Sequence, residues 1–251
     1  MAKRKNRKKR RPPVRPGAPE QAGPQDRQGR KEQARLEREA RIKRARRRQL
    51  LRRLWRAGIV LLVIAAIAAT VWFAQSGSRR ARQAAAQAAE RIGCADVESK
   101  AEAGRDHITA QDPPPAYPSQ PATSGPHRGD ATLGTDADLD VFPDPIDESL
   151  EPLAVHNLEH GYVFLYYRAD GPDSLPGNVQ DALGELARER PKVVLAPYPS
   201  LPQGTSLAFT AWNKLQTCPR VTDAEGAVTV AGGFIDRFGG ASGEAPEPNA
   251  A

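Results

Sequence analysis

The sequence predicts an α+β protein in which a single transmembrane helix precedes a small extracytoplasmic domain with a mixed β-sheet and flanking helices. Three observations support this fold class. Residues 1–56 hold 23 basic and 5 acidic side chains, whereas residues 57–251 hold 14 basic and 25 acidic ones. The eighteen residues 57–74 include no charged side chain. Further along the chain, β-favouring runs lie on both sides of one helical pattern.

The composition narrows the class of protein before any motif is considered. A basic N-terminal part attached to an acidic remainder argues against one uniformly basic nucleic-acid-binding domain. The only two cysteines, Cys94 and Cys218, exclude both a disulfide-dense miniprotein and a zinc site with four thiolates. We therefore expect one domain of ordinary size with basic and apolar appendages.

The basic N-terminal part divides into two segments. Residues 1–29 are rich in Lys, Arg and Pro and have little apolar surface, so we expect a disordered cytoplasmic tail. Residues 30–56 lack Gly and Pro and are rich in Arg, Glu, Ala and Leu, which predicts a basic juxtamembrane helix. Apart from Trp55, no aromatic residue interleaves these charges for base stacking. Membrane lipids are therefore the expected partner of this segment, and nucleic acid is not.

Residues 57–74 have the length and composition of a transmembrane helix. Eighteen residues at about 1.5 Å each cover roughly 27 Å, close to the thickness of the hydrocarbon core of a bilayer. Arginines crowd the N-terminal flank, so the positive-inside rule places the N-terminus in the cytoplasm and the C-terminal body outside the cell membrane. A cleaved signal peptide is the alternative, but bulky Trp72 would then stand where cleavage requires a small residue.

The remainder of the chain predicts a helical stalk at residues 75–92, an extracytoplasmic domain at 93–238 and a disordered tail at 239–251. The expected helix of the domain is long enough to cross over between two parallel strands, which is why a mixed sheet is expected. The predicted elements are this helix, at residues 179–187, and strands at residues 162–167, 193–196 and 206–212.

Cys94 and Cys218 both lie in the part of the chain expected outside the membrane. In an oxidising compartment they can form a disulfide that closes a long loop. Two buried free thiols are the alternative, because sequence separation does not show that the α-carbons lie within about 7 Å of each other.

All four histidines lie in the body of the protein, and three of them form a candidate metal site. His156 and His160 are four residues apart, so on a helical turn both imidazoles face the same side and can hold one ion. His127, on a loop stiffened by a proline, supplies a third ligand, and His107 and Glu159 are further candidates. This ligand set is typical of zinc or copper sites. The alternative is that these histidines make structural hydrogen bonds.

The run from His156 to His160 also matches the His-x-x-Glu-His motif of inverted zinc peptidases, in which the histidines bind zinc and the glutamate activates water. Glu159 would then be the catalytic base. Against this reading, Gly161 and a β-favouring run follow the motif at once, whereas such a motif needs a long helix.

Several short blocks of the chain, among them Ser124-Gly125-Pro126-His127 and the run from His156 to Gly161, are similar in order to those of the bacterial membrane-anchored domain of unknown function 3105 family. The combination of Ser-Gly-Pro-His with His-Asn-Leu-Glu-His-Gly is the specific part of this resemblance. The chain departs from the family pattern at Arg128 and Asn213, where an aromatic residue and a glycine are usual. The resemblance covers roughly residues 93–248 and names no reaction. The blocks are Gly93-Cys94, His107, 121–127, 155–161, Ala196-Pro197-Tyr198, Thr210-Ala211-Trp212, Phe234-Ile235 and Glu247-Pro248.

Three functions fit these residues, and they leave open whether the protein is an enzyme. The first is a membrane-anchored binding or structural domain that holds zinc or copper through His127, His156 and His160. The second is a zinc-dependent hydrolase with Glu159 as its base. The third is a domain whose histidines are structural and whose partner is another envelope protein.

Overall fold

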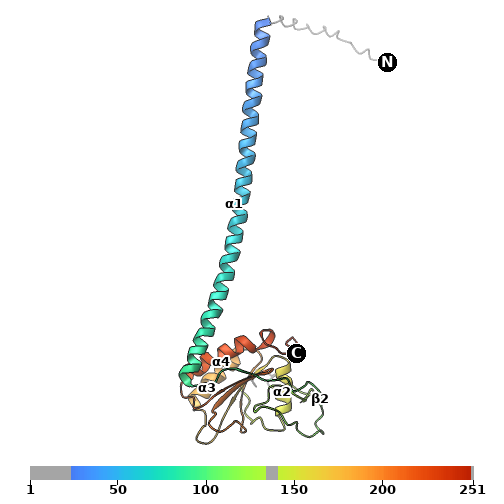
Figure 1. Ribbon diagram of the computed structural model, residues 1–251, viewed down its shortest axis with the longest axis vertical. Coiled ribbons are helices and arrows are strands. Elements are labelled where there is room, and N and C mark those ends of the chain that lie inside the picture. Colours follow the sequence, from blue (N-terminus) through green and yellow to red (C-terminus); the bar gives the residue numbers. More distant parts are fainter. Residues whose placement is uncertain (1–23, 134–140, 250–251) are drawn as a thin grey trace, which may run out of the picture. The chain divides into compact units, whose positions relative to one another are not determined.

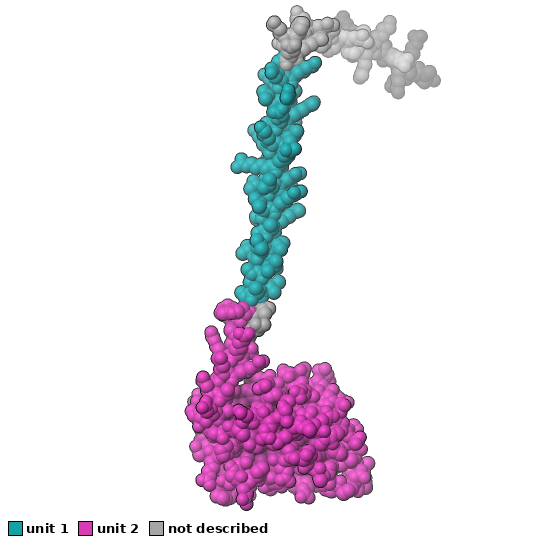
Figure 2. Space-filling model, in the orientation of Figure 1, with its two compact units in different colours: residues 1–71 teal, residues 72–251 magenta. Residues whose placement is uncertain are grey.

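The computed structural model describes residues 24–133 and 141–249. The chain divides into two compact units, residues 1–71 and 72–251, and each is described by itself (Figure 2). Helix α1, Pro24–Ile92, is 69 residues long and belongs in part to each unit (Figure 1). Its abundant Arg, Ala, Leu and Gln are strong helix formers. The predicted disordered tail falls mainly on residues 1–23, which lie outside the described residues.

The predicted transmembrane helix at residues 57–74 needs correction. Within the described part of the chain, no helix combines the length and the apolar character needed to cross a bilayer. Residues 57–70 are an apolar part of α1. Its large side chains, such as those of Leu61 and Leu62, are exposed. This finding contradicts the predicted single-pass transmembrane helix, on which the predicted cell-membrane location and extracytoplasmic placement depended.

The second unit is built on a mixed five-stranded sheet, with the strand order β1-β7-β6-β4-β5. Strands β4 and β5 are parallel and are joined by helix α3, Gly177–Glu189, whereas the other neighbours are antiparallel. The body is therefore α+β, with the crossover in the position that the sequence suggested. The strands are β1 (Glu98–Ser99), β4 (Val163–Tyr167), β5 (Val193–Pro197), β6 (Leu207–Ala211) and β7 (Lys214–Cys218).

Different helices cover the two faces of this sheet (Figure 1). Helices α3 and α4, Ala224–Phe238, pack on one face, and α2, Glu151–Glu159, packs on the other. Side chains alternate between the faces along β4, because successive residues of a strand point in opposite directions. Val163 and Leu165 join the α3–α4 cluster, whereas Phe164 and Tyr166 join the α2 cluster. The sheet thus separates two apolar cores.

Helix α1 ends at a glycine and leads directly into a disulfide. Gly93 has a positive φ of 76°, and the Cys94 amide donates to the Ala89 carbonyl at 2.8 Å, which closes the last turn. Cys94, the residue after Gly93, forms a disulfide with Cys218 at the end of β7. In the chain-entropy model, a bridge between residues 124 positions apart contributes about 4–5 kcal/mol to stability.

The segment after α4 is held against the body by its polar groups. A short 3-10 helix, η1 (Gly240–Ser242), follows α4. The Lys214 ammonium then pairs with Glu244 at 2.8 Å, and the Lys192 ammonium donates to the Pro248 carbonyl at 3.0 Å. Disorder was predicted for residues 239–251, and residues 250–251 lie outside the description. Up to Pro248, the structure instead gives this segment defined partners.

Candidate metal centre

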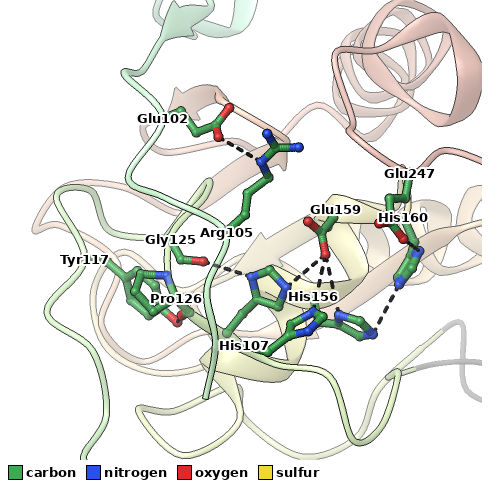
Figure 3. Close-up of polar contacts among 11 residues, drawn as sticks. Glu102, Arg105, His107, Tyr117, Gly125, Pro126, His156, Glu159, His160 and Glu247 are labelled. Atoms are coloured by element: carbon green, nitrogen blue, oxygen red, sulfur yellow. Dashed lines mark hydrogen bonds and ion pairs between the residues drawn. The ribbon is translucent and has the colours of Figure 1, made fainter.

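Four side chains from three short elements meet on the α2 side of the sheet (Figure 3). His107 and His127 are paired in register on the two-residue parallel strands β2 (His107–Ile108) and β3 (His127–Arg128). His156 and Glu159 lie three residues apart on α2, on neighbouring positions of one helical face. One nitrogen or oxygen atom of each side chain lies within 4.8 Å of the others, so the four could hold one metal ion.

Helix α2 carries His156 and Glu159, and it is a short helix with well-defined ends. Pro152 stands in its first turn, where a proline without an N–H is tolerated. Its end is fixed by Gly161, whose φ of 81° is a left-handed conformation that favours glycine. Gly161 also lies against Gly240, since a Cβ at this position would come 3.0 Å from the Gly240 α-carbon.

The loop that carries His127 is anchored by a buried carboxylate. Glu151 Oε1 accepts hydrogen bonds from the Ala122 amide at 2.9 Å and from the Tyr198 hydroxyl at 2.6 Å. The Tyr117 hydroxyl donates to the Pro126 carbonyl at 2.8 Å and holds the other end of the loop. Burial raises the pKa of the Glu151 carboxyl, and the two hydrogen bonds offset part of that rise.

His127 is completely buried, and both of its ring nitrogens face acceptors. Nδ1 lies 2.9 Å from the Gly125 carbonyl oxygen, and Nε2 lies 2.9 Å from Glu159 Oε2. Since a carbonyl can only accept, Nδ1 carries the proton of a neutral ring and Nε2 presents a lone pair to the carboxylate. Two lone pairs that face each other at this distance repel, so a cation must lie between or beside them. The cation is either a second proton on the ring or a metal ion.

His156 presents a free ring nitrogen to the same carboxylate. Its Nδ1 is buried without a hydrogen-bond partner and lies 3.9 Å from Glu159 Oε2. Its Nε2 lies 3.2 Å from Nε2 of His160, so one of these two nitrogens donates to the other. Burial, followed by the neighbouring histidines, lowers the pKa of His156 to about 4, and the ring is therefore neutral at pH 7. A neutral ring is the form that binds metals.

The direction of the hydrogen bond between His156 and His160 determines which ring nitrogen of His156 keeps its lone pair. If Nε2 of His156 donates to His160, then Nδ1 of His156 keeps its lone pair and faces Glu159. His160 Nδ1 in turn lies 3.9 Å from Glu247 Oε2, on the segment that follows α4 (Figure 3). The order Glu247, His160, His156 is the arrangement by which outer groups orient a metal-binding histidine.

The structure brings together most, but not all, of the side chains that the sequence proposed. His127, His156, Glu159 and His107 belong to the group, and its ligand role stays a prediction. His160 is not a member, and it contacts the group through His156. The sequence reasoning missed Glu247 as an outer partner, and the only signal for it was its place in the last block of the family resemblance.

The position of Glu159 bears on the peptidase reading of the motif. Its Oε2 atom lies 2.9 Å from His127, 3.8 Å from His107 and 3.9 Å from His156, measured to ring nitrogens. This is the place of a ligand among three others, whereas a catalytic base must be directed at a water molecule. In addition, His160 is not in the group that converges with Glu159, although its Nε2 lies 3.2 Å from Nε2 of His156.

Comparison with known proteins gives one match. The model of a family described as "Protein of unknown function (DUF3105)" matches residues 108–251, which is more than half of the chain. The matched region contains His127, His156 and Glu159 and begins one residue after His107. No curated protein and no solved structure gives a match.

Proposed function

The chain belongs to the DUF3105 family of proteins of unknown function, and from that premise we propose that its domain binds one divalent transition-metal ion. The ligands are His107 Nε2, His127 Nε2, His156 Nδ1 and Glu159 Oε2. The observation that carries this proposal is the convergence of four ligand atoms within 4.8 Å of one another, three of them on buried residues.

The spacing of the ligand atoms supports a four-coordinate centre. In a tetrahedral site with bonds of about 2.0–2.1 Å, neighbouring ligand atoms lie about 3.3 Å apart. The distances from Glu159 Oε2 to the three ring nitrogens are 2.9, 3.8 and 3.9 Å. The widest separation in the group, 4.8 Å, must close by about 1.5 Å, so small side-chain movements bring this set to metal-binding geometry.

The electrostatics of the site favour a cation over a network of hydrogen bonds alone. Glu159 is a buried carboxylate, and a buried charge needs a partner of opposite sign. A second proton on His127 would supply one positive charge, but it would leave His156 Nδ1 buried and without a partner. A divalent ion satisfies the carboxylate and the free ring nitrogen together.

The ligand types favour zinc or copper. Imidazole nitrogen is the preferred donor for zinc, copper, nickel and iron, and the group contains three imidazoles and no thiolate. Divalent copper normally binds such sites more tightly than divalent zinc. Zinc-dependent hydrolysis is not proposed, because Glu159 occupies a ligand position and no other observation favours it.

Metal content of the full-length protein tests this proposal. The purified protein, stripped with chelator, reloaded with zinc and dialysed at neutral pH, is expected to retain one zinc per chain. His127→Ala and His156→Ala should each lose it, while circular dichroism shows that the fold is kept. The matched pair Glu159→Gln and Glu185→Gln separates the buried ligand from an exposed glutamate on α3, and only the former should weaken binding. Wild-type protein without bound zinc or copper would refute the proposal.

A further inference from the structure

We infer that His107 is the exchangeable ligand of this centre, the position at which the bound ion is taken up and released to an incoming donor. This inference rests on the proposed function and concerns how the same site is used. The three buried ligands, His127, His156 and Glu159, keep hold of the ion, and His107 is the position at which one donor replaces another.

The four ligands differ sharply in exposure. The His107 side chain is 61% exposed, whereas those of His127, His156 and Glu159 are 0%, 10% and 7% exposed. A donor arriving from solvent can therefore reach the ion from the His107 side. The other three ligands are buried and are not accessible in this way.

The four ligands also differ in how firmly they are held. His127 is fixed by the Gly125 carbonyl, and His156 by the ring of His160. Among the described residues, no hydrogen bond holds the His107 ring, whose Nε2 lies 3.8 Å from Glu159 Oε2. Its strand, β2, is two residues long and pairs with β3 alone. A ligand without an outer partner is the one that leaves at the lowest cost.

The ring of His107 lies against a glycine that leaves it room. A Cβ at Gly129 would come within 3.2–3.4 Å of three atoms of the His107 imidazole. A larger residue at this position would require the His107 ring to move, while leaving all the ligands in the chain. This contact offers a second way to disturb His107, without removing a nitrogen donor.

Loss of His107 leaves a recognised kind of open site. Two histidines and one carboxylate form a three-ligand set that keeps a fourth position for an incoming group. In the exchange, the bond from the ion to His107 Nε2 breaks, and a lone pair of the arriving donor atom forms the new bond. The ion keeps its oxidation state, and no electron or co-reactant is needed.

Zinc release from the loaded full-length protein tests this inference. Wild type, His107→Ala, Gly129→Val and His127→Ala are each loaded with zinc, and transfer to the chromogenic chelator pyridylazoresorcinol is followed over time. His107→Ala should retain one zinc and release it faster by about tenfold or more, because losing a ligand costs at least as much as losing a ligand's outer partner, which is worth about 10–100-fold. Gly129→Val should change the rate in the same direction. Millimolar imidazole should slow release from His107→Ala, because it fills the vacated position, and should not restore zinc to His127→Ala.

The outcomes separate this inference from the proposed function. Wild-type protein without zinc would overturn both. If wild type retains one zinc but His107→Ala loses zinc as completely as His127→Ala does, only the exchange role is overturned. Unchanged release from His107→Ala, or faster release that imidazole does not slow, would also overturn it.

Discussion

The two faces of the sheet bury different kinds of side chain. Under α3 and α4, the centre of the core is apolar, with Leu183, Phe209 and Phe234 among its buried side chains. Under α2, the apolar cluster borders buried His127, Glu151 and Glu159. Burying polar and charged groups costs free energy unless they are paired, and apolar burial does not carry this cost. The first face therefore contributes mainly to stability, whereas the second face holds the candidate metal centre at some cost in stability.

The largest effect is expected from the apolar face. Phe209→Ala removes a fully buried ring that packs against Phe234, and it should lower the free energy of unfolding by about 3–5 kcal/mol. Zinc content of the folded protein should be unchanged. Phe164→Ala is the matched change on the α2 face, where it also removes a buried ring, and it should in addition weaken zinc binding. Denaturant unfolding and metal analysis check both, and equal zinc affinity in the two variants would break the comparison.

A smaller effect, confined to the site, is expected from the outer partner of His156. His160→Ala removes the ring that fixes the free nitrogen of His156, so zinc affinity should fall by about 10–100-fold, as for other outer-sphere partners. Competition with a zinc chelator measures this change. Glu247→Gln is the milder control, because the Glu247 side chain is 58% exposed. Affinity that is insensitive to His160→Ala would show that His156 is oriented by something else.

The smallest effect concerns the carboxylate that anchors the His127 loop. Burial raises the pKa of Glu151 in the folded state, so its contribution to stability is present at low pH and is lost as pH rises through that raised value. Glu151→Gln removes this titration, so stability relative to wild type should improve as pH rises above the ordinary glutamate range. Unfolding curves between pH 4 and pH 8 measure the difference. A wild-type advantage that grows with pH would mean that the pKa of Glu151 is lowered instead.

Local patterns predicted the centre of the sheet well. The β-favouring run at 162–167 and the helical spacing at 179–187 correspond to β4 and α3, because both are amphipathic or apolar over their whole length. Helix α4 was not predicted, since Gly232 and Gly233 lower helix propensity in its middle. Strand β7 was missed because it is only five residues long and its apolar side chains are limited to Leu215 and Cys218.

The candidate site could be predicted only in part. His156 and Glu159 share a helix, so their proximity follows from spacing alone. The same reasoning made His160 a ligand, but the helix ends before it, and its ring is turned toward Glu247. The meeting of His107 with His127 depends on a pairing of two-residue strands, which no periodicity in the sequence can indicate.

Anomalous diffraction at the zinc edge, from crystals of the zinc-loaded protein, tests the central claim most directly. The account predicts one peak about 2.0–2.1 Å from His107 Nε2, His127 Nε2, His156 Nδ1 and the nearer oxygen of Glu159, with His160 outside the ligand shell. A peak held between His156 and His160, with Glu159 turned away, or no peak at this group, would contradict it.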